Sequence, residues 1–185
     1  MGKKKDKNYA FIDGQNLNLA IKDQGWRLDF RSFRIYLRDK YKIEKAFIFI
    51  GYIGEHRTLY KSLQEFGYIL VFKPTLILPN GKVKGNVDAE LVLHAMVEYK
   101  NYGKALIVTG DGDFYCLVEY LLGQGKLLNL MIPNRFKYSS LLRKFSDSIV
   151  FMNNLRGKLE YKQKVRRKQK RDIASGQNPS DSLLS

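Results

Sequence analysis

The chain has 185 residues, of which 44% are apolar and 13% aromatic, enough for one α/β domain with its own core and too few for two ordinary domains. Its 33 lysines and arginines against 18 aspartates and glutamates give a net charge of +15, which favours a polyanionic partner unless the excess lysine serves only solubility. This composition excludes a wholly disordered protein, and no apolar run approaches the roughly 18 residues of a membrane helix. A single cysteine excludes a disulfide scaffold, so a reducing cytoplasm is the expected compartment.

Segments typical of strands alternate with segments typical of helices, as expected of βαβ units around a parallel sheet. The predicted strands are 9–13, 46–52, 68–73, 105–109, 127–132 and a short 149–152. Helices are predicted from apolar residues at helical spacing. They fall over 30–37, over 59–66 with Gly67 as C-cap, over 87–99 with Asn86 as N-cap, and from the 110–113 loop to the breaks at Gly123 and Gly125.

Two segments depart from this alternation. Residues 76–78 and 82–84 flank Pro79-Asn80-Gly81 like the arms of a small hairpin, which is either a flap over a ligand or a surface excursion. Residues 156–171 hold nine basic residues and one acid, which predicts a basic helical extension. The chain is therefore divided into a basic N-terminal tail (1–8), one domain (9–154), and a basic helical extension with a disordered C-terminal tail (155–185).

Acidic residues follow the predicted strands at two places and begin a helix at a third. Asp13 ends the first strand, Asp111 and Asp113 follow the fourth in a glycine-rich loop, and Asp88 lies in the first turn of a predicted helix. Ligands of an open parallel sheet bind at the carboxyl ends of the strands, so these acids are expected to meet there. Helix capping is the ordinary alternative, and it is favoured for Asp88 taken alone.

Clustered carboxylates repel each other, by roughly 3–4 kcal/mol per pair at about 4–5 Å and an effective dielectric constant of about 20. A divalent cation removes this cost, and Mg²⁺ or Mn²⁺ prefers such oxygen ligands. The expected chemistry is metal-assisted hydrolysis, in which the ion activates water and neutralises charge that develops on a phosphate. The two histidines, His56 and His94, form no predicted pair, so a zinc site is not expected.

Three blocks carry a family resemblance: IDGQNL at 12–17, KGNVD at 84–88 and VTGDGDF at 108–114. In this order they resemble the signature blocks of NYN domains, a branch of the PIN-like nuclease superfamily, over about 9–154. The resemblance implies a three-layer α/β/α sandwich with a mainly parallel central sheet, a Mg²⁺ or Mn²⁺ site, and a ribonuclease of RNA processing or decay.

The resemblance also implies roles for individual residues. Asn16 would be an auxiliary polar residue, and Thr109 would offer a hydroxyl to a water or a phosphate. Lys84, Arg135 and Lys137 are expected to contact the phosphate backbone, although Lys84 is equally explained as a solvated lysine. The implied catalytic and metal-binding quartet is Asp13, Asp88, Asp111 and Asp113.

The favoured partner is single-stranded RNA, because aromatic residues that follow the fifth strand are interleaved with basic ones and would stack on unpaired bases. DNA is the alternative polymer, no membrane partner is expected, and a homodimer is a second expected state because PIN-like domains often pair.

Other functions fit the sequence less well. A non-catalytic RNA-binding adaptor that retains the metal site is the main alternative. Phosphatases of the haloacid dehalogenase class need Asp-x-Asp after the first strand, where this chain has Asp13-Gly14-Gln15. A nucleotide-binding regulator would need a Walker A or Gly-x-Gly-x-x-Gly turn there, and neither follows the strand.

Overall fold

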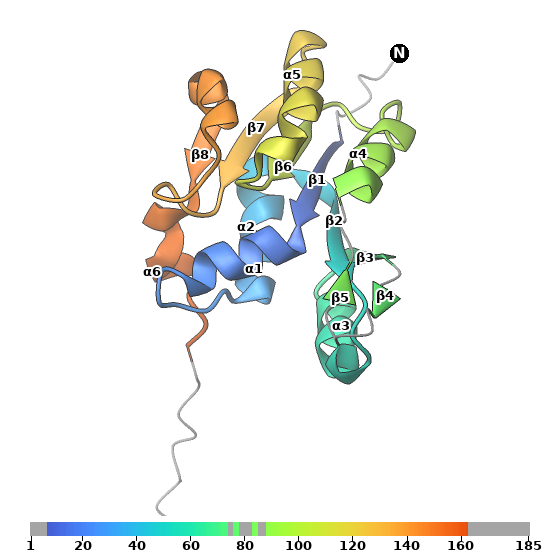
Figure 1. Ribbon diagram of the computed structural model, residues 1–185, viewed down its shortest axis with the longest axis vertical. Helices are drawn as coiled ribbons and strands as arrows, with labels where there is room; N and C mark the ends of the chain where they lie inside the picture. Colours follow the sequence, from blue (N-terminus) through green and yellow to red (C-terminus); the bar gives the residue numbers. More distant parts are fainter. Residues whose placement is uncertain (1–6, 74–75, 78–82, 85–87, 163–185) are drawn as a thin grey trace, which may run out of the picture.

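The computed structural model describes residues 7–73, 76–77, 83–84 and 88–162. At its centre is a six-stranded sheet in the order β3-β2-β1-β6-β7-β8 (Figure 1). Every neighbouring pair of strands in this sheet is parallel. The strands are β1 (Asn8–Asp13), β2 (Ile43–Gly51), β3 (Tyr68–Lys73), β6 (Ala105–Val108), β7 (Leu127–Ile132) and β8 (Ile149–Phe151).

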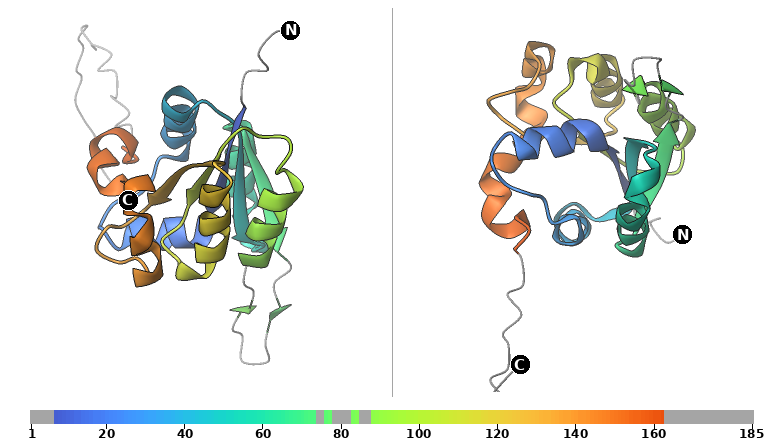
Figure 2. Two further views of the ribbon diagram at one scale, coloured as in Figure 1. Left: turned by 90° about the horizontal axis from the view of Figure 1, so that it is seen from above. Right: turned by 60° about the horizontal axis from the view of Figure 1, so that its bottom comes forward.

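Helices cover both faces of the sheet, so the predicted three-layer α/β/α fold is confirmed (Figure 2). One face packs against α1 (Gly14–Lys22), α2 (Phe30–Tyr41), α3 (Arg57–Glu65) and α6 (Arg156–Leu159). The other packs against α4 (Asp88–Val97), α5 (Tyr115–Gly123) and the 3₁₀ segment η3 (Ser140–Ser148). Short 3₁₀ turns complete the chain: η1 (Gly54–His56), η2 (Gly112–Phe114) and η4 (Met152–Leu155).

The central strands are apolar over most of their length because both of their faces are buried there. In β1, Phe11 packs toward α4 and α5, whereas Ile12 packs toward α1 and α2. The Phe11 ring stacks on Phe47 of β2 with 5.3 Å between ring centroids. These contacts fix the carboxyl ends of β1 and β2 relative to each other. The residues that follow the two strands therefore start from a rigid sheet.

The order of the strands reverses at β1. The chain builds β2 and β3 outward on one side of β1, then returns through α4 to place β6, β7 and β8 on the other side. The chain leaves the neighbouring strands β1 and β6 toward opposite faces of the sheet, and ligands of such sheets bind beyond the carboxyl ends at this point. Gly14 begins α1 at this point, where a Cβ atom would lie 2.4 Å from Ile50 Cγ2 and 2.9 Å from the Phe49 carbonyl oxygen. Glycine is thus needed for α1 to start so close to β2.

The predicted elements agree with the structure to within three residues at the strand ends. Gly67 and Gly125 follow their helices with φ of +89° and +66°, as C-cap glycines do. Strands β4 (Leu76–Ile77) and β5 (Val83–Lys84) pair antiparallel and form the predicted hairpin arms. The turn at 78–82 and the predicted cap Asn86 lie outside the described residues.

The predicted basic helix is short where it can be followed. It ends at Leu159, because Glu160 turns to form an antiparallel bridge with Leu28 at the start of α2. Residues 163–171 of the predicted extension lie outside the described part of the chain. None of the described helices is long and apolar enough to cross a membrane.

Candidate functional site

Asp13 is a buried carboxylate at the carboxyl end of β1, with 4% of its surface exposed. Its Oδ1 accepts the Asn16 backbone N–H at 3.0 Å and so caps α1. Its Oδ2 accepts the Thr109 hydroxyl at 3.1 Å. Burial, with a smaller contribution from the charges of Asp88 and Asp111, raises the pKa of Asp13 to about 6 against the effect of these two hydrogen bonds.

The loop after β6 is tied to Asp13 through Thr109. The Thr109 side chain is fully buried, and its hydroxyl also accepts the Asp111 backbone N–H at 3.1 Å. Asp111 Oδ1 in turn accepts the Asp113 backbone N–H at 3.1 Å, which caps η2. The Thr109 hydroxyl therefore donates to Asp13 and accepts from the Asp111 backbone, and it joins the two loops.

Asn16 makes a second link between the same loops. Its Oδ1 accepts the Gly110 backbone N–H at 2.8 Å, while its own backbone N–H donates to Asp13. The first and third signature blocks are therefore held together by hydrogen bonds on both sides of Asp13. Such links fix carboxylates that would otherwise separate by repulsion.

The four predicted acids occupy three kinds of position. Asp13 is buried, whereas Asp88 and Asp111 are partly buried and close enough for their charges to act on it. Asp113 is exposed at the outer side of the loop. Across the described residues, no three acidic, histidine or cysteine side chains converge closely enough to enclose a metal ion. The acids therefore concentrate negative charge at the carboxyl ends of β1 and β6, but among the described residues they do not enclose a metal site.

These donors fit a hard divalent cation that keeps part of its water. Mg²⁺ is commonly bound through one or two carboxylates, with water and substrate phosphate completing its coordination. Asp13 and Asp111 are carboxylates at one edge, and the pKa of Asp13 is raised first by burial and then by the charges of Asp88 and Asp111. A bound cation would lower this pKa and stabilise the ionised carboxylate.

The loop after β7 brings two predicted basic residues to the same edge. It touches the acidic loop directly, since the Ser139 backbone N–H donates to the Gly110 carbonyl at 2.9 Å. The Arg135 guanidinium is exposed and lies 5.5 Å from the centre of the Phe136 ring, which is 80% exposed. Lys137 is also exposed, but its ammonium is paired with Asp23 at 2.7 Å.

The structure says less about two other candidates. Lys84 belongs to β5, and its side chain is outside the described part of the structure. His94 is partly buried, with Nδ1 2.9 Å from the Glu90 carbonyl oxygen and its ring against Phe49. It is therefore a packing residue between α4 and β2.

Comparison with known proteins identifies the family. The model of the NYN domain matches residues 9–181. The chain belongs to the NYN domain family. The NYN domain is a branch of the PIN-like nucleases, whose members generally bind nucleic acid and generally use divalent metal ions.

Two further comparisons agree with this assignment. The chain is 25% identical over 160 residues to the Low amplitude and bright protein LabA of Synechococcus elongatus, covering 81% of this chain and 86% of that protein. It is also similar in structure to a protein of unknown function from Vibrio parahaemolyticus, with a TM-score of 0.71 at 19% identity. That similarity covers 87% of this chain and 99% of the other, and it shows the shared fold.

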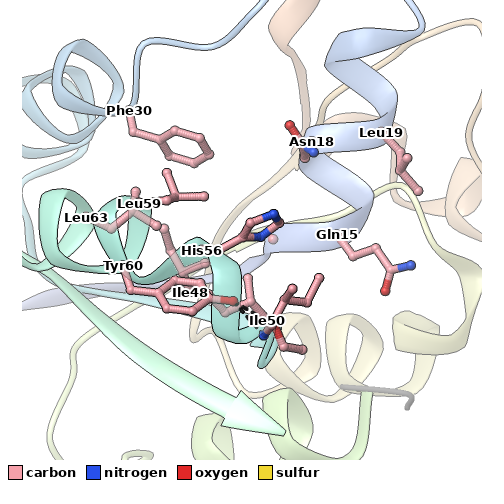
Figure 3. A pocket seen from close by; sticks show the side chains of 13 residues that line it. Gln15, Asn18, Leu19, Phe30, Ile48, Ile50, His56, Leu59, Tyr60 and Leu63 are labelled. Atoms are coloured by element: carbon pink, nitrogen blue, oxygen red, sulfur yellow. Dashed lines mark hydrogen bonds between the residues drawn. The ribbon is translucent and has the colours of Figure 1, made fainter. Parts of the chain in front are cut away.

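A pocket of about 380 Å³ lies in this NYN domain on the face of the sheet that α1 and α3 cover, and no local sequence pattern predicted it (Figure 3). It is lined by the start of α1, the first residue of α2, the end of β2, the η1 turn and α3. Gly14 and Gln15, which line it, follow Asp13 directly in the chain. The pocket lining therefore begins at the carboxyl end of β1, directly after Asp13 in the chain.

Proposed function

We propose that this NYN protein is a Mg²⁺- or Mn²⁺-dependent ribonuclease that hydrolyses phosphodiester bonds in single-stranded RNA. The proposal rests above all on Asp13, a carboxylate buried where the strand order reverses and fixed there by Asn16 and Thr109. Burial of an acid beside two other acids costs stability, so a binding function explains it better than a structural one. Membership of a PIN-like nuclease family agrees with this explanation.

In this proposal each residue has a distinct task. Asp13 and Asp111 hold the cation, and Asp88 and Asp113 add negative charge around it. When bound, the ion activates water and offsets the charge that develops on the phosphate. Thr109 and Asn16 keep the two carboxylates in place through the hydrogen bonds described above.

The basic residues provide the contact with the polymer. Arg135 is exposed beside the acidic loop and has a planar guanidinium suited to phosphate. Lys137 would have to exchange Asp23 for a phosphate oxygen, and Lys84 would contact the backbone from the hairpin. The net charge of +15 attracts RNA to the chain without regard to sequence.

A second function has one observation in its favour. Because the described residues contain no closed cluster of three metal ligands, an RNA-binding adaptor that does not cleave its ligand is the alternative. The acids would then bind a cation weakly, and the basic residues would act as before.

Cleavage assays separate the two functions. Labelled single-stranded RNA, structured RNA and single-stranded DNA are incubated with Mg²⁺, Mn²⁺ or EDTA. The variants are Asp13→Asn and Asp111→Asn, with the exposed Asp147→Asn as a matched control. Metal-dependent cleavage of single-stranded RNA, lost in both site variants and kept in the control, is the expected result. Salt-dependent RNA binding without cleavage under any condition would favour the adaptor.

A further inference from the structure

One wall of this pocket is held in place by two hydrogen bonds of Tyr60. The Tyr60 hydroxyl accepts the Ile53 backbone N–H at 2.9 Å and donates to the Gly51 carbonyl at 3.3 Å. These hydrogen bonds pin the segment between β2 and η1 against α3. The concave shape is therefore maintained by specific contacts, as in a preformed ligand site.

Large apolar side chains stay exposed around the mouth of this pocket. Leu19 is 55% exposed, Ile53 43% and Leu59 45%, and they come from three separate elements. Exposed apolar side chains that gather around a hollow, rather than singly, mark a surface that binds something. Phe30 adds an aromatic ring to the same lining (Figure 3).

Polar groups occur on one side of the apolar lining. Gln15 and Asn18 are one turn apart on α1, and Figure 3 shows them across from Leu59 and Tyr60, with the His56 ring between. Both amides are exposed, and no hydrogen bond involves either side chain among the residues that the structure describes. An amide offers a donor and an acceptor together, which is the pattern found on the edges of nucleobases.

Size and charge narrow the choice of ligand. A volume of about 380 Å³ is near the lower end of small-ligand sites, which range over roughly 300–1,000 Å³, so it suits a planar group rather than a helix or a strand. The net charge of the chain is +15, which favours a ligand attached to an anionic backbone. Flat, apolar faces with a hydrogen-bonding edge on a polyanion describe an unpaired base of single-stranded nucleic acid.

We propose that this pocket receives one unpaired nucleobase of the RNA, from a nucleotide adjacent to the phosphate bound at Asp13. The base lies between the apolar walls, and Gln15 and Asn18 hydrogen bond to its edge. The inference deepens the proposed function by giving the nuclease a subsite that selects a flexible, unpaired strand. A base in a duplex cannot reach the pocket, since its edge and faces are already occupied.

Binding in EDTA tests the pocket separately from cleavage. Fluorescein-labelled eight-nucleotide RNAs are titrated with the full chain, and anisotropy gives the dissociation constant. Leu59→Trp fills the pocket, and its matched control is Leu122→Trp, which alters an equally exposed leucine (44%) at the far end of α5. The double variant Gln15→Ala/Asn18→Ala removes the amides, with Gln64→Ala on the exposed side of α3 as its control.

The expected losses follow from the value of base stacking. Leu59→Trp weakens RNA binding by roughly tenfold or more, as the loss of one stacked base does, whereas Leu122→Trp leaves it unchanged. The amide double variant weakens binding for some bases more than others. An RNA with one abasic position binds the wild type as weakly as the intact RNA binds Leu59→Trp, and combining the two causes no further loss.

Two results would overturn the inference. One is equal RNA affinity for Leu59→Trp and Leu122→Trp at unchanged melting temperature, which would mean that the pocket serves another ligand. The other is that removal of a base from the RNA weakens binding to the wild type and to Leu59→Trp by the same factor. If an abasic RNA binds more weakly but no RNA is ever cleaved, the pocket proposal holds and the nuclease proposal fails. If Leu59→Trp binds and cleaves RNA normally, the pocket proposal fails and the nuclease proposal holds.

Discussion

Replacing Asp13 by asparagine removes the buried charge while keeping the shape of the side chain. The pKa of this carboxyl is raised from 3.8 to about 6 in the folded protein. At about 1.4 kcal/mol per pKa unit, ionisation of Asp13 costs the folded state about 3 kcal/mol at pH 7. The variant escapes this cost, so without metal it should be the more stable protein.

Hydrogen bonding reduces the gain. Asparagine caps a helix as well as aspartate does and can still accept the Asn16 N–H. However, the Thr109 hydroxyl loses a charged acceptor, and one such loss is worth about 1 kcal/mol. The expected net effect of Asp13→Asn is therefore about 2 kcal/mol of added stability at pH 7.5, or a rise in Tm of roughly 4–8 °C.

The pH dependence has a definite sign. A carboxyl whose pKa is raised by folding contributes full stability below its ordinary pKa of 3.8, and that contribution is lost as the pH rises through about 6. The advantage of Asp13→Asn should therefore shrink from about 2 kcal/mol at pH 7.5 to about zero at pH 4.5. Other carboxylates titrate in both proteins and cancel in the difference.

Urea unfolding in EDTA at pH 4.5, 6.0 and 7.5 measures this difference. Asp147→Asn, which alters an exposed carboxylate, should differ little from wild type at each pH. The reasoning is refuted if Asp13→Asn is no more stable than wild type at pH 7.5. It is also refuted if its advantage does not decline toward pH 4.5, because the buried charge would then not be the cause.

Three other effects are expected. Mn²⁺ at about ten times its dissociation constant should raise the unfolding free energy of wild type by about 1.4 kcal/mol in a thermal shift series, and it should have no effect on Asp13→Asn or Asp111→Asn; equal stabilisation of all three would place the ion elsewhere. Gly14→Ala should lower stability by roughly 1–3 kcal/mol, because its Cβ meets Ile50 Cγ2 and a backbone oxygen, whereas Gly123→Ala meets nothing within 4 Å and should be neutral in the same denaturant series. Phe136→Ala, at a side chain that is 80% exposed, should keep the Tm and weaken single-stranded RNA binding by roughly fivefold or more if the ring stacks on a base; unchanged affinity would exclude that contact.

Much of the fold could be predicted from the sequence. Runs such as 105–108 are apolar at every position, and 127–132 has Asn129 as its one polar residue, because both faces of those strands are covered; this local pattern is visible without the structure. The positions of Asp13 and Asp111 at strand ends were visible too. Since parallel strands share one carboxyl edge, the approach of their loops followed from topology alone.

Contacts that join distant elements required the tertiary structure. Lys137 was predicted to meet phosphate, yet its ammonium pairs with Asp23, 114 residues earlier in the chain. Thr109 was expected to offer its hydroxyl to a ligand, and the structure shows it bonded to Asp13 and to the Asp111 backbone. No local pattern encodes these partners.

Local residue patterns predicted the strands, the helices α2, α3, α4 and α5, and the acids that follow β1 and β6, because each depends on residues near one another in the chain. Three features depend on tertiary contacts: the depth at which Asp13 is buried, the approach of Asp88 to it, and the pocket to which α1, α2, β2, η1 and α3 contribute. Burial and charge coupling arise from the crossover that returns the chain to the far side of β1, and they depend on distances that spacing in the sequence does not express.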